Sequence, residues 1–357
     1  MLISETTAAI LVKSQDLLVV GEIELPSELL LGQVLVEVIT SGICGAQINE
    51  IEAIKGPDRF LPHLLGHEGF AKVLQIGPGV TFVSPGDQVV MHWRPGAGIQ
   101  AVPPVYKYKG MPLNAGWVTT FNNHAVVSEN RITKISGTNY DKNIIPLLGC
   151  ALTTALGVLK NDAQIIPSDS LLIFGVGGLG LLLIKIAKIL GIKNITVIDI
   201  HKDKLSKAVE LGASKTIIFT DRDQATYALS EFFGHEFPTV VIDTTGNTSA
   251  IEICYEISAP NARVILVGVP KKGTKASFYT LPLHFGKILK GSEGGQSKPE
   301  KDIPYLLKLI EDNKLCFNDY PTKSFSINEI NIAISELKSG IVGRMIIDFN
   351  MNDQALL

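Results

Sequence analysis

Short runs of apolar residues, separated by glycine and proline, fill the first part of the chain, up to Cys150. Examples are residues 34–39, 69–74 and 88–91, with turn sequences such as Gly77-Pro78-Gly79 between them. Short strands at this spacing are typical of a β-rich barrel or sandwich. We therefore predict a β domain in this part of the chain.

The pattern changes after Cys150, where strand-like and helix-like segments begin to alternate. Such βα units predict a parallel sheet with helices on both faces, which places the chain in the α/β class. After Gly291 the alternation loosens. The predicted strands are residues 171–174, 195–200, 216–219, 240–243, 264–267 and 343–349, and the clearest predicted helices are residues 178–190, 202–211, 303–313 and 328–339.

One segment, Arg94–Gly116, fits neither pattern. It holds Pro103, Pro104 and Pro112 around the cluster Tyr106-Lys-Tyr-Lys109. We predict a long loop here, and long loops inside compact domains are often functional.

A glycine-rich sequence, Gly175-Val-Gly-Gly-Leu-Gly180, stands between the first strand of the alternating region and its first helix. Glycines at these positions allow a tight turn, close approach of a pyrophosphate to the backbone, and packing of the helix on the sheet. The start of the helix attracts the negative pyrophosphate. The predicted cofactor residues here are Gly175, Gly177, Gly178, Leu179 and Gly180.

Asp199 ends the next predicted strand, about 20 residues after the glycines. Its carboxylate can accept hydrogen bonds from the ribose hydroxyls of NAD, and its charge would repel the additional phosphate of NADP. The sequence therefore predicts an NAD site. The plainer alternative is a flexible glycine turn with a solvated aspartate.

Composition excludes several classes of function. The chain has 357 residues, 46% of them hydrophobic and 19% charged, and a formal net charge of −3. This length and composition favour two folded domains, and the charge offers no basic patch for nucleic acid. The longest apolar stretch runs only from Leu171 to Ile184, short of the about 20 residues that span a bilayer. The N-terminal sequence shows no secretory signal, so we expect a cytoplasmic protein with no membrane partner.

The cysteine spacing points to free thiols rather than disulfides. Cys44, Cys150, Cys254 and Cys316 are far apart and form no CxxC pair. Two of these thiolates and one imidazole, His67, would suit a catalytic zinc with an open fourth position. Because the three are dispersed, buried apolar cysteines and a hydrogen-bonded histidine remain the alternative. Cys254 and Cys316 are interpreted as ordinary core or surface thiols.

From residue 31 to residue 349 the chain resembles the zinc-containing medium-chain alcohol dehydrogenases. The resemblance is carried by the order and spacing of several short sequences. They are Gly42-Ile-Cys-Gly45, Gly66-His-Glu-Gly69, Gly86-Asp87, Gly149-Cys-Ala-Leu-Thr-Thr154, the glycine-rich sequence, Asp199 with Lys204, Val267-Gly-Val-Pro270, and Ser339-Gly340 to Arg344.

The resemblance implies a fold and a set of site residues. It implies a GroES-like catalytic domain over residues 1–151 and 292–357, with a Rossmann NAD-binding domain over residues 152–291. It implies that Cys44, His67 and Cys150 hold the catalytic zinc, with Glu68 as a neighbouring carboxylate that can approach the metal. It further implies cofactor contacts from Thr154 at the nicotinamide, Lys204 at the ribose, Arg344 at the pyrophosphate, and Val269, and a homodimer or homotetramer.

The chain also departs from the family pattern. Residues 94–116 contain no cysteine, where many members have four that bind a structural zinc, so we expect one zinc per chain. Ala46 and Asn49 occupy positions that often relay a proton, and neither side chain titrates. Gln47 replaces a common aspartate.

Three further residues are candidates for the surroundings of the active site. Asn49 and Trp93 are candidates for the substrate pocket, with plain core packing as the alternative for Trp93, whereas His92 is expected on the opposite face of its strand, in the core. His63 is either close to the metal site or exposed.

The resemblance implies reversible oxidation of an alcohol to a carbonyl with NAD. A polyol, sugar or sugar derivative is favoured over ethanol, because the 94–116 segment offers donors and aromatic rings, and a polyol could relay its own proton. The alternatives are a zinc-free quinone or enone reductase of the same superfamily and a non-catalytic NAD-binding protein.

Overall fold

The computed structural model describes residues 3–137, 140–219, 229, 231–234 and 236–351. Its contacts divide the chain into two compact units, one of residues 1–150, 298–307 and 322–357, the other of residues 151–297 and 308–321. The predicted division placed all of 292–357 with the first domain. Within the second unit, Asp319 pairs with Lys185 at 2.5 Å, and the Tyr320 hydroxyl donates to the Gly178 carbonyl. These contacts attach 308–321 to the second unit.

Two β-sheets form the first unit. One has the order β4-β1-β2-β7-β8, and the other has the order β10-β6-β5-β3-β18-β17 with β9 also paired to β3. The β-rich fold predicted for this region is confirmed, although β1, β2 and β9 were not predicted. The strands are β1 Glu5–Leu11, β2 Val19–Glu24, β3 Gln33–Ile43, β4 His63–Leu64, β5 Glu68–Ile76, β6 Gln88–His92, β7 Tyr106–Tyr108, β8 Met111–Leu113, β9 His124–Ser128, β10 Ile132–Lys134, β17 Thr322–Phe325 and β18 Arg344–Asp348.

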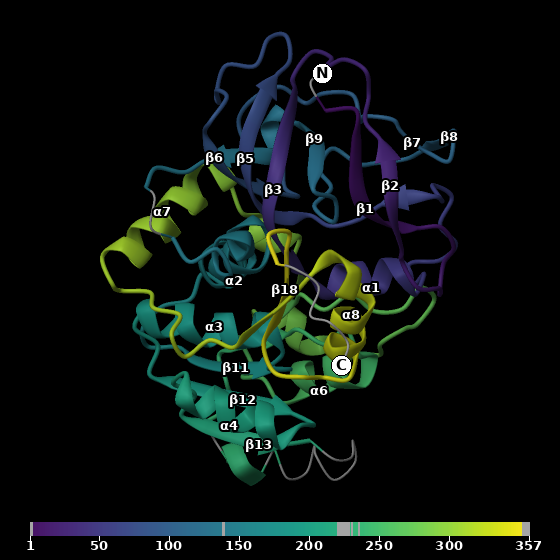
Figure 1. Ribbon diagram of the computed structural model, residues 1–357. Coiled ribbons are helices and arrows are strands. Elements are labelled where there is room, and N and C mark those ends of the chain that lie inside the picture. The colour runs from purple at the N-terminus through teal and green to yellow at the C-terminus, as the bar shows by residue number, and fades with distance from the viewer. Residues whose placement is uncertain (1–2, 138–139, 220–228, 230, 235, 352–357) are drawn as a thin grey trace. The chain divides into compact units, whose positions relative to one another are not determined.

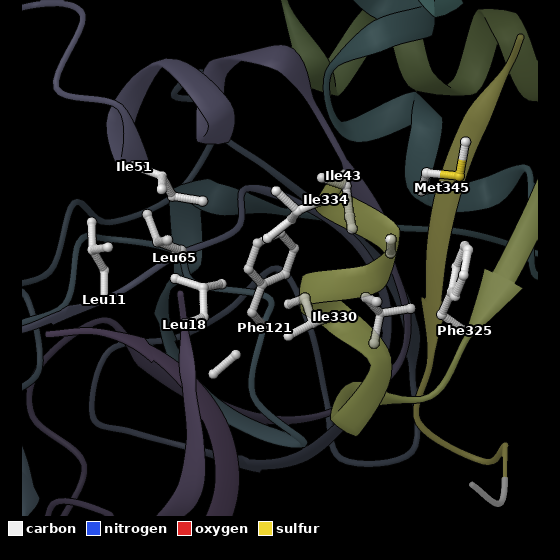
Figure 2. Close-up of a cluster of buried hydrophobic side chains, with 13 residues drawn as sticks. Leu11, Leu18, Ile43, Ile51, Leu65, Phe121, Phe325, Ile330, Ile334 and Met345 are labelled. Carbon is white, nitrogen blue, oxygen red and sulfur yellow. The ribbon is translucent and has the colours of Figure 1, made fainter. Parts of the chain in front are cut away.

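A buried apolar cluster joins the C-terminal segment to the first unit. Figure 2 shows Phe121 beside Ile330 and Ile334 of helix α8 (Ile330–Lys338), and all three side chains are buried. Met345 of β18 belongs to the same cluster. The apolar face of α8 thus places β18 beside β3, and with it Arg344.

The prediction of a long loop at 94–116 holds for residues 94–105 and is wrong for residues 106–113. Residues 106–113 form the hairpin β7–β8, and β7 pairs with β2 at the edge of the first sheet. The Tyr106 side chain is fully buried, and its hydroxyl accepts a hydrogen bond from the Val126 backbone N–H at 2.7 Å. Pro112 is tolerated because β8 is an edge strand, where a missing N–H breaks no sheet pairing. The prolines made the alternation of buried and exposed side chains in this segment hard to recognise in the sequence.

The second unit is a parallel sheet with the strand order β13-β12-β11-β14-β15-β16, which confirms the predicted α/β fold. In Figure 1, β11, β12 and β13 lie side by side with the helices α3 (Gly178–Ile189) and α4 (Lys202–Glu210). The chain leaves β11 for β12 on one side and returns to β14 on the other, and ligands of such sheets bind where the order reverses. The strands are β11 Ser170–Phe174, β12 Asn194–Asp199, β13 Lys215–Ile218, β14 Val240–Asp243, β15 Arg263–Leu266 and β16 Ile288–Gly291.

Helices α3, α4 and α8 match their predicted bounds to within two residues, whereas α7 begins at Pro299, before the predicted start at residue 303. Part of the helical stretch expected between β13 and β14 lies outside the described residues. Within the described ranges, no helix is both long and apolar enough to span a bilayer. The α-helices are α1 Gly45–Ile51, α2 Ala151–Gly157, α3 Gly178–Ile189, α4 Lys202–Glu210, α6 Thr248–Glu256, α7 Pro299–Glu311 and α8; the short helices include η2 Ile145–Gly149, η3 Val158–Asp162 and η4 Leu281–Phe285.

Candidate metal centre and cofactor site

Three side chains that are dispersed in the sequence meet in the first unit. The Sγ atoms of Cys44 and Cys150 and a ring nitrogen of His67 lie within 4.8 Å of one another. Cys44 follows the last residue of β3, and His67 precedes the first residue of β5. Since these strands are antiparallel neighbours, the two residues lie at the same end of the sheet.

Glycines next to His67 and Cys150 let the backbone at these two ligand candidates pack closely against neighbouring residues. Gly66, next to His67, has φ +89°, and a Cβ there would lie 2.2 Å from Thr120 Oγ1. A Cβ on Gly149, next to Cys150, would lie 2.1 Å from the Met91 carbonyl oxygen. The turn that ends at Cys150 can therefore contact the strand β6 only with glycine at this position.

The two thiols influence each other's ionisation. A hydrogen bond from Cys150 lowers the pKa of Cys44 despite burial, with help from the charges of Arg344 and His67. The pKa of Cys150 is raised, by its hydrogen bond to Cys44, by burial and by the Cys44 and Glu68 charges. One thiolate thus forms readily, and the second needs a cation to compensate its charge.

The imidazole completes this set. Burial disfavours a charged His67, but the neighbouring Cys44 and Glu68 outweigh burial and raise the pKa of its ring. Its Nε2 atom is buried and has no hydrogen-bond partner of ordinary geometry among the described residues. Two sulfurs and a nitrogen gathered around a common point fit a zinc ion, which prefers such ligands at tetrahedral spacing.

Glu68 and Arg344 lie beside this cluster. Glu68 is fully buried, and Arg344 Nη2 lies 3.5 Å from its Oε1 atom. Arg344 Nη1 donates to the carbonyl of Ile43 at 3.0 Å, and the residue is 5% exposed. The sequence prediction gave Arg344 a pyrophosphate contact; within the first unit, its observed partners are Glu68 and Ile43.

Gln47 is a neighbour of the metal candidates that the sequence prediction did not place in the site. Its Oε1 accepts a hydrogen bond from the Cys44 backbone N–H at 2.8 Å. Its Nε2 lies 2.5 Å from His67 Nδ1, and the residue is fully buried. Its place three positions after a metal-ligand candidate at the start of a helix, and its replacement of a common aspartate, were the signals that could have identified it.

The pocket candidates Asn49 and Trp93 are both partly exposed. Trp93 lies under the guanidinium of Arg94, with 5.5 Å between the guanidinium carbon and the ring centroid. His92 is 1% exposed, with Nδ1 bonded to the Arg94 carbonyl and Nε2 to Thr133 Oγ1. His92 is therefore a core residue, as predicted.

His63, which the sequence left open, is buried rather than exposed. Its Nε2 pairs with Asp58 at 2.8 Å, and its Nδ1 bonds the Leu64 carbonyl at 2.9 Å. Glu50 brings a third ligand atom into the same neighbourhood. The His63–Asp58 pair braces the segment between α1 and β4.

In the second unit the glycine loop has the predicted form. Gly175 has φ +91°, and a Cβ on Gly180 would lie 2.2 Å from the Gly175 carbonyl oxygen. By contrast, a Cβ on Gly177 would meet nothing within 4 Å. Gly177, Gly178 and Leu179 are partly exposed at the start of α3. The loop is therefore closed on the sheet side and open where a pyrophosphate would approach.

The Asp199 carboxylate fixes the glycine loop by hydrogen bonds and also lies beside it. Its Oδ2 accepts from the Val176 N–H at 2.8 Å, and its Oδ1 accepts from the His201 N–H at 3.0 Å. Across the reversal of strand order, Thr244 Oγ1 donates to the Gly175 carbonyl at 2.8 Å. The sequence prediction missed Thr244, which follows β14 and is followed by Thr245-Gly246, a turn sequence that could have pointed to it.

Three further cofactor candidates belong to the second unit, whereas Arg344 belongs to the first. Thr154 is buried on α2, with 6% of its surface exposed. Lys204 is half-buried on α4, and Val269 follows β15 with 46% exposed. Gly246, at φ +68°, contacts the Val269 backbone closely, so the loops after β14 and β15 form one rim.

Two protein-family models and a curated relative match the chain. Residues 31–137 match the family model described as the alcohol dehydrogenase GroES-like domain, and residues 178–312 match that of the zinc-binding dehydrogenases. S-(hydroxymethyl)glutathione dehydrogenase from Escherichia coli O1:K1 / APEC is 26% identical over 344 residues, which cover 89% of this chain and 93% of that protein.

The chain belongs to the zinc-dependent medium-chain alcohol dehydrogenase/reductase family. Membership in this family of alcohol dehydrogenases supports an oxidoreductase that acts on alcohols.

Two solved structures of alcohol dehydrogenases have the same fold. An alcohol dehydrogenase zinc-binding domain protein from Burkholderia ambifaria has a TM-score of 0.87 at 24% identity, covering 97% of this chain and 99% of its own. An E. coli CFT073 alcohol dehydrogenase complexed with NADH has a TM-score of 0.79 at 21% identity, covering 97% and 100%.

Proposed function

We propose that the chain is a zinc-dependent, NAD-linked alcohol dehydrogenase that moves a hydride between a CH–OH carbon and the nicotinamide ring. The observation that carries this proposal is the meeting of Cys44, His67 and Cys150 within 4.8 Å. Two thiolates and one imidazole leave a fourth tetrahedral position for substrate, as catalytic zinc sites do. One catalytic zinc and no structural zinc is the expected content.

Zinc, when bound, would supply the Lewis acidity that lowers the pKa of an alcohol hydroxyl towards neutrality. The chain's own residues would do the rest. Cys44, His67 and Cys150 would hold the ion, and the buried Glu68–Arg344 pair would set the charge beside it. The open face at Gly177 would accept the pyrophosphate, and Asp199 would orient the adenosine ribose of NAD in preference to NADP.

Thr154, Lys204 and Val269 are proposed to complete the NAD site. Thr154 would lie against the nicotinamide, and Lys204 would flank the ribose. The solved dehydrogenase of the same fold that holds NADH supports the choice of cofactor. Arg344 keeps its proposed pyrophosphate role only if its guanidinium can serve both Glu68 and the cofactor.

For the substrate we propose a polyol, sugar or sugar derivative, with Asn49 and Trp93 at the pocket. Ala46 and Asn49 cannot relay a proton by titrating, so a substrate hydroxyl or a water would carry it. The second reason for a sugar substrate was the donors and aromatic rings of residues 94–116, and the structure weakens it. Tyr106 is buried, and Lys107 lies 3.9 Å from Glu24.

The E. coli relative favours a second substrate class, the adduct of formaldehyde with a thiol, because its name is S-(hydroxymethyl)glutathione dehydrogenase. Such an adduct also carries a CH–OH group. A panel of aliphatic alcohols, polyols, sugar phosphates and hydroxymethyl thiols, followed by NADH absorbance, separates the two proposals. Unchanged preference after Lys107→Ala and Lys109→Ala would further count against the sugar proposal.

We propose a homodimer or homotetramer built through the sheet of the second unit. Its edge strand β16 is flanked by exposed apolar side chains, among them Tyr279 and Phe285, each 71% exposed. A second copy could cover them by pairing sheet edges across a two-fold axis. A monomer by light scattering at micromolar concentration would contradict this proposal. Cytoplasmic location stays a prediction.

The decisive experiment measures bound zinc and NADH-linked turnover in one preparation. One zinc per chain with turnover of an alcohol is the expected result. Turnover of quinones or enones without zinc would favour the zinc-free reductase. NAD binding without turnover of any alcohol would favour a non-catalytic NAD-binding protein.

A further inference from the structure

The hydrogen bonds of Gln47 conflict with the state that His67 needs in order to bind a metal through Nε2. A histidine ligand uses the lone pair of one ring nitrogen and carries its proton on the other, which then needs an acceptor. The group that faces His67 Nδ1 is the carboxamide of Gln47, at 2.5 Å from its Nε2 atom. That atom is an NH₂ group, a donor and never an acceptor.

The orientation of the carboxamide follows from a second contact. The backbone N–H of Cys44 can only donate, and it reaches Gln47 Oε1 at 2.8 Å. Oε1 is the single acceptor of the side chain, and this bond turns the NH₂ group towards His67. Gln47 is fully buried, so bulk water does not relieve a mismatch there.

Both neutral tautomers of the ring are therefore imperfect. With its proton on Nε2, His67 accepts well from Gln47, but its N–H then has the Cys44 sulfur, a weak acceptor, as its neighbour among the described residues. With its proton on Nδ1, as zinc requires, two donors face each other. Reversing the carboxamide only moves the conflict to the Cys44 N–H.

We infer that Gln47 is a positioning residue that weakens zinc binding, by stabilising the His67 tautomer that cannot ligate through Nε2. The inference rests on the proposed zinc site. A carboxylate of the same length has two acceptor oxygens and would accept from the Cys44 N–H and from His67 Nδ1–H together. Gln47→Glu should therefore bind zinc more tightly than the natural chain.

The affinity test compares Gln47→Glu with the natural chain by competition with a chromogenic zinc chelator. Changes in the partner of a histidine ligand alter metal affinity by about 10- to 100-fold, so a Kd lower by this factor is expected. Gln75→Glu, an exposed glutamine on β5, adds the same charge and should leave the Kd unchanged. Gln47→Ala removes the conflict without supplying an acceptor, and an intermediate Kd is expected.

A Kd for Gln47→Glu equal to or above that of the natural chain, while the natural chain binds one zinc, would overturn the inference and leave the proposed function standing. The same tightening in Gln75→Glu would also overturn it, since charge alone would then be the cause. Absence of zinc binding in the natural chain and in Gln47→Glu alike would overturn both proposals.

A second measurement needs no zinc and leaves Gln47 unchanged. Nitrogen-15 NMR of the zinc-free natural protein reports the tautomer of His67, with His67→Gln used to assign its resonances. We expect the proton on Nε2. A proton found on Nδ1 would show that Gln47 offers its oxygen, and it would overturn the inference whatever the affinities.

Discussion

The two units present their chemistry in opposite ways. In the second unit, the glycine loop and Asp199 lie within one βαβ stretch, and a hydrogen bond from the Val176 N–H to Asp199 joins them. In the first unit, the metal candidates are spread from Cys44 to Cys150 and meet only because β3, β5 and η2 converge. A local motif needs only its own turn to form, whereas a dispersed site needs the whole unit to fold.

The strongest test of this contrast is Cys44→Ser. We expect loss of zinc and a fall in turnover of at least about 1000-fold, since Lewis-acid activation is worth several kcal/mol. NADH binding, measured by fluorescence titration, should stay unchanged because the glycine loop is built separately. The matched control is Cys316→Ser, an exposed cysteine whose loss should change neither property. Loss of NADH binding together with zinc in Cys44→Ser would show that the two sites do not form independently.

Acid should affect the first unit through His92. Burial lowers the pKa of this histidine from 6.5 to about 4. The unfolded chain therefore takes up a proton first as pH falls, and stability present above pH 6.5 is lost between about 6.5 and 4, by up to about 3 kcal/mol.

Urea denaturation of the natural chain and His92→Gln at pH 7 and pH 5 measures this effect. The variant should lose less stability between the two pH values than the natural chain does. The same substitution at His284, an exposed histidine of η4, should leave the natural pH dependence in place. Equal pH dependence in natural chain and His92→Gln would exclude His92 as the cause.

The glycine loop offers a matched pair that separates folding from binding. Gly180→Ala places a Cβ 2.2 Å from the Gly175 carbonyl oxygen, so we expect a loss of about 1–3 kcal/mol in stability together with weaker NADH binding. Gly177→Ala meets nothing within 4 Å, so its stability should change by no more than about 0.5 kcal/mol while NADH binding still weakens. Zinc content should persist in both. Unaltered NADH affinity in Gly177→Ala would disprove the pyrophosphate assignment.

The smallest expected effect is on cofactor choice. Asp199→Ala removes the charge that would repel NADP and the acceptor for the Val176 N–H. We expect the ratio of kcat/KM for NAD over NADP to fall by about tenfold, about 1.4 kcal/mol, with some loss of NAD affinity. Steady-state kinetics with both cofactors measures it. Equal efficiency with both cofactors in the natural chain would refute the assignment.

Much of the fold could be predicted because its elements have strong local patterns. Strand β14 was predicted at its observed bounds, and α3 and α4 to within one residue at their ends. The loop prediction failed at residues 106–113. Three prolines in the segment outweighed the short alternation of Tyr106 and Tyr108, and only pairing with β2 makes this part a strand. Strand β3 is longer than predicted, since its polar end pairs with β5 and β18.

By itself, the sequence determined the α/β class, the turn of the glycine loop and the list of metal candidates, because each rests on residue types at short or familiar spacing. The tertiary structure alone decided that Cys44, His67 and Cys150 meet, and that Arg344 lies against Glu68. It also decided that the NH₂ group of Gln47 faces His67. The direction of a buried hydrogen bond depends on every donor and acceptor around it, and those come from strands and turns far apart in the chain.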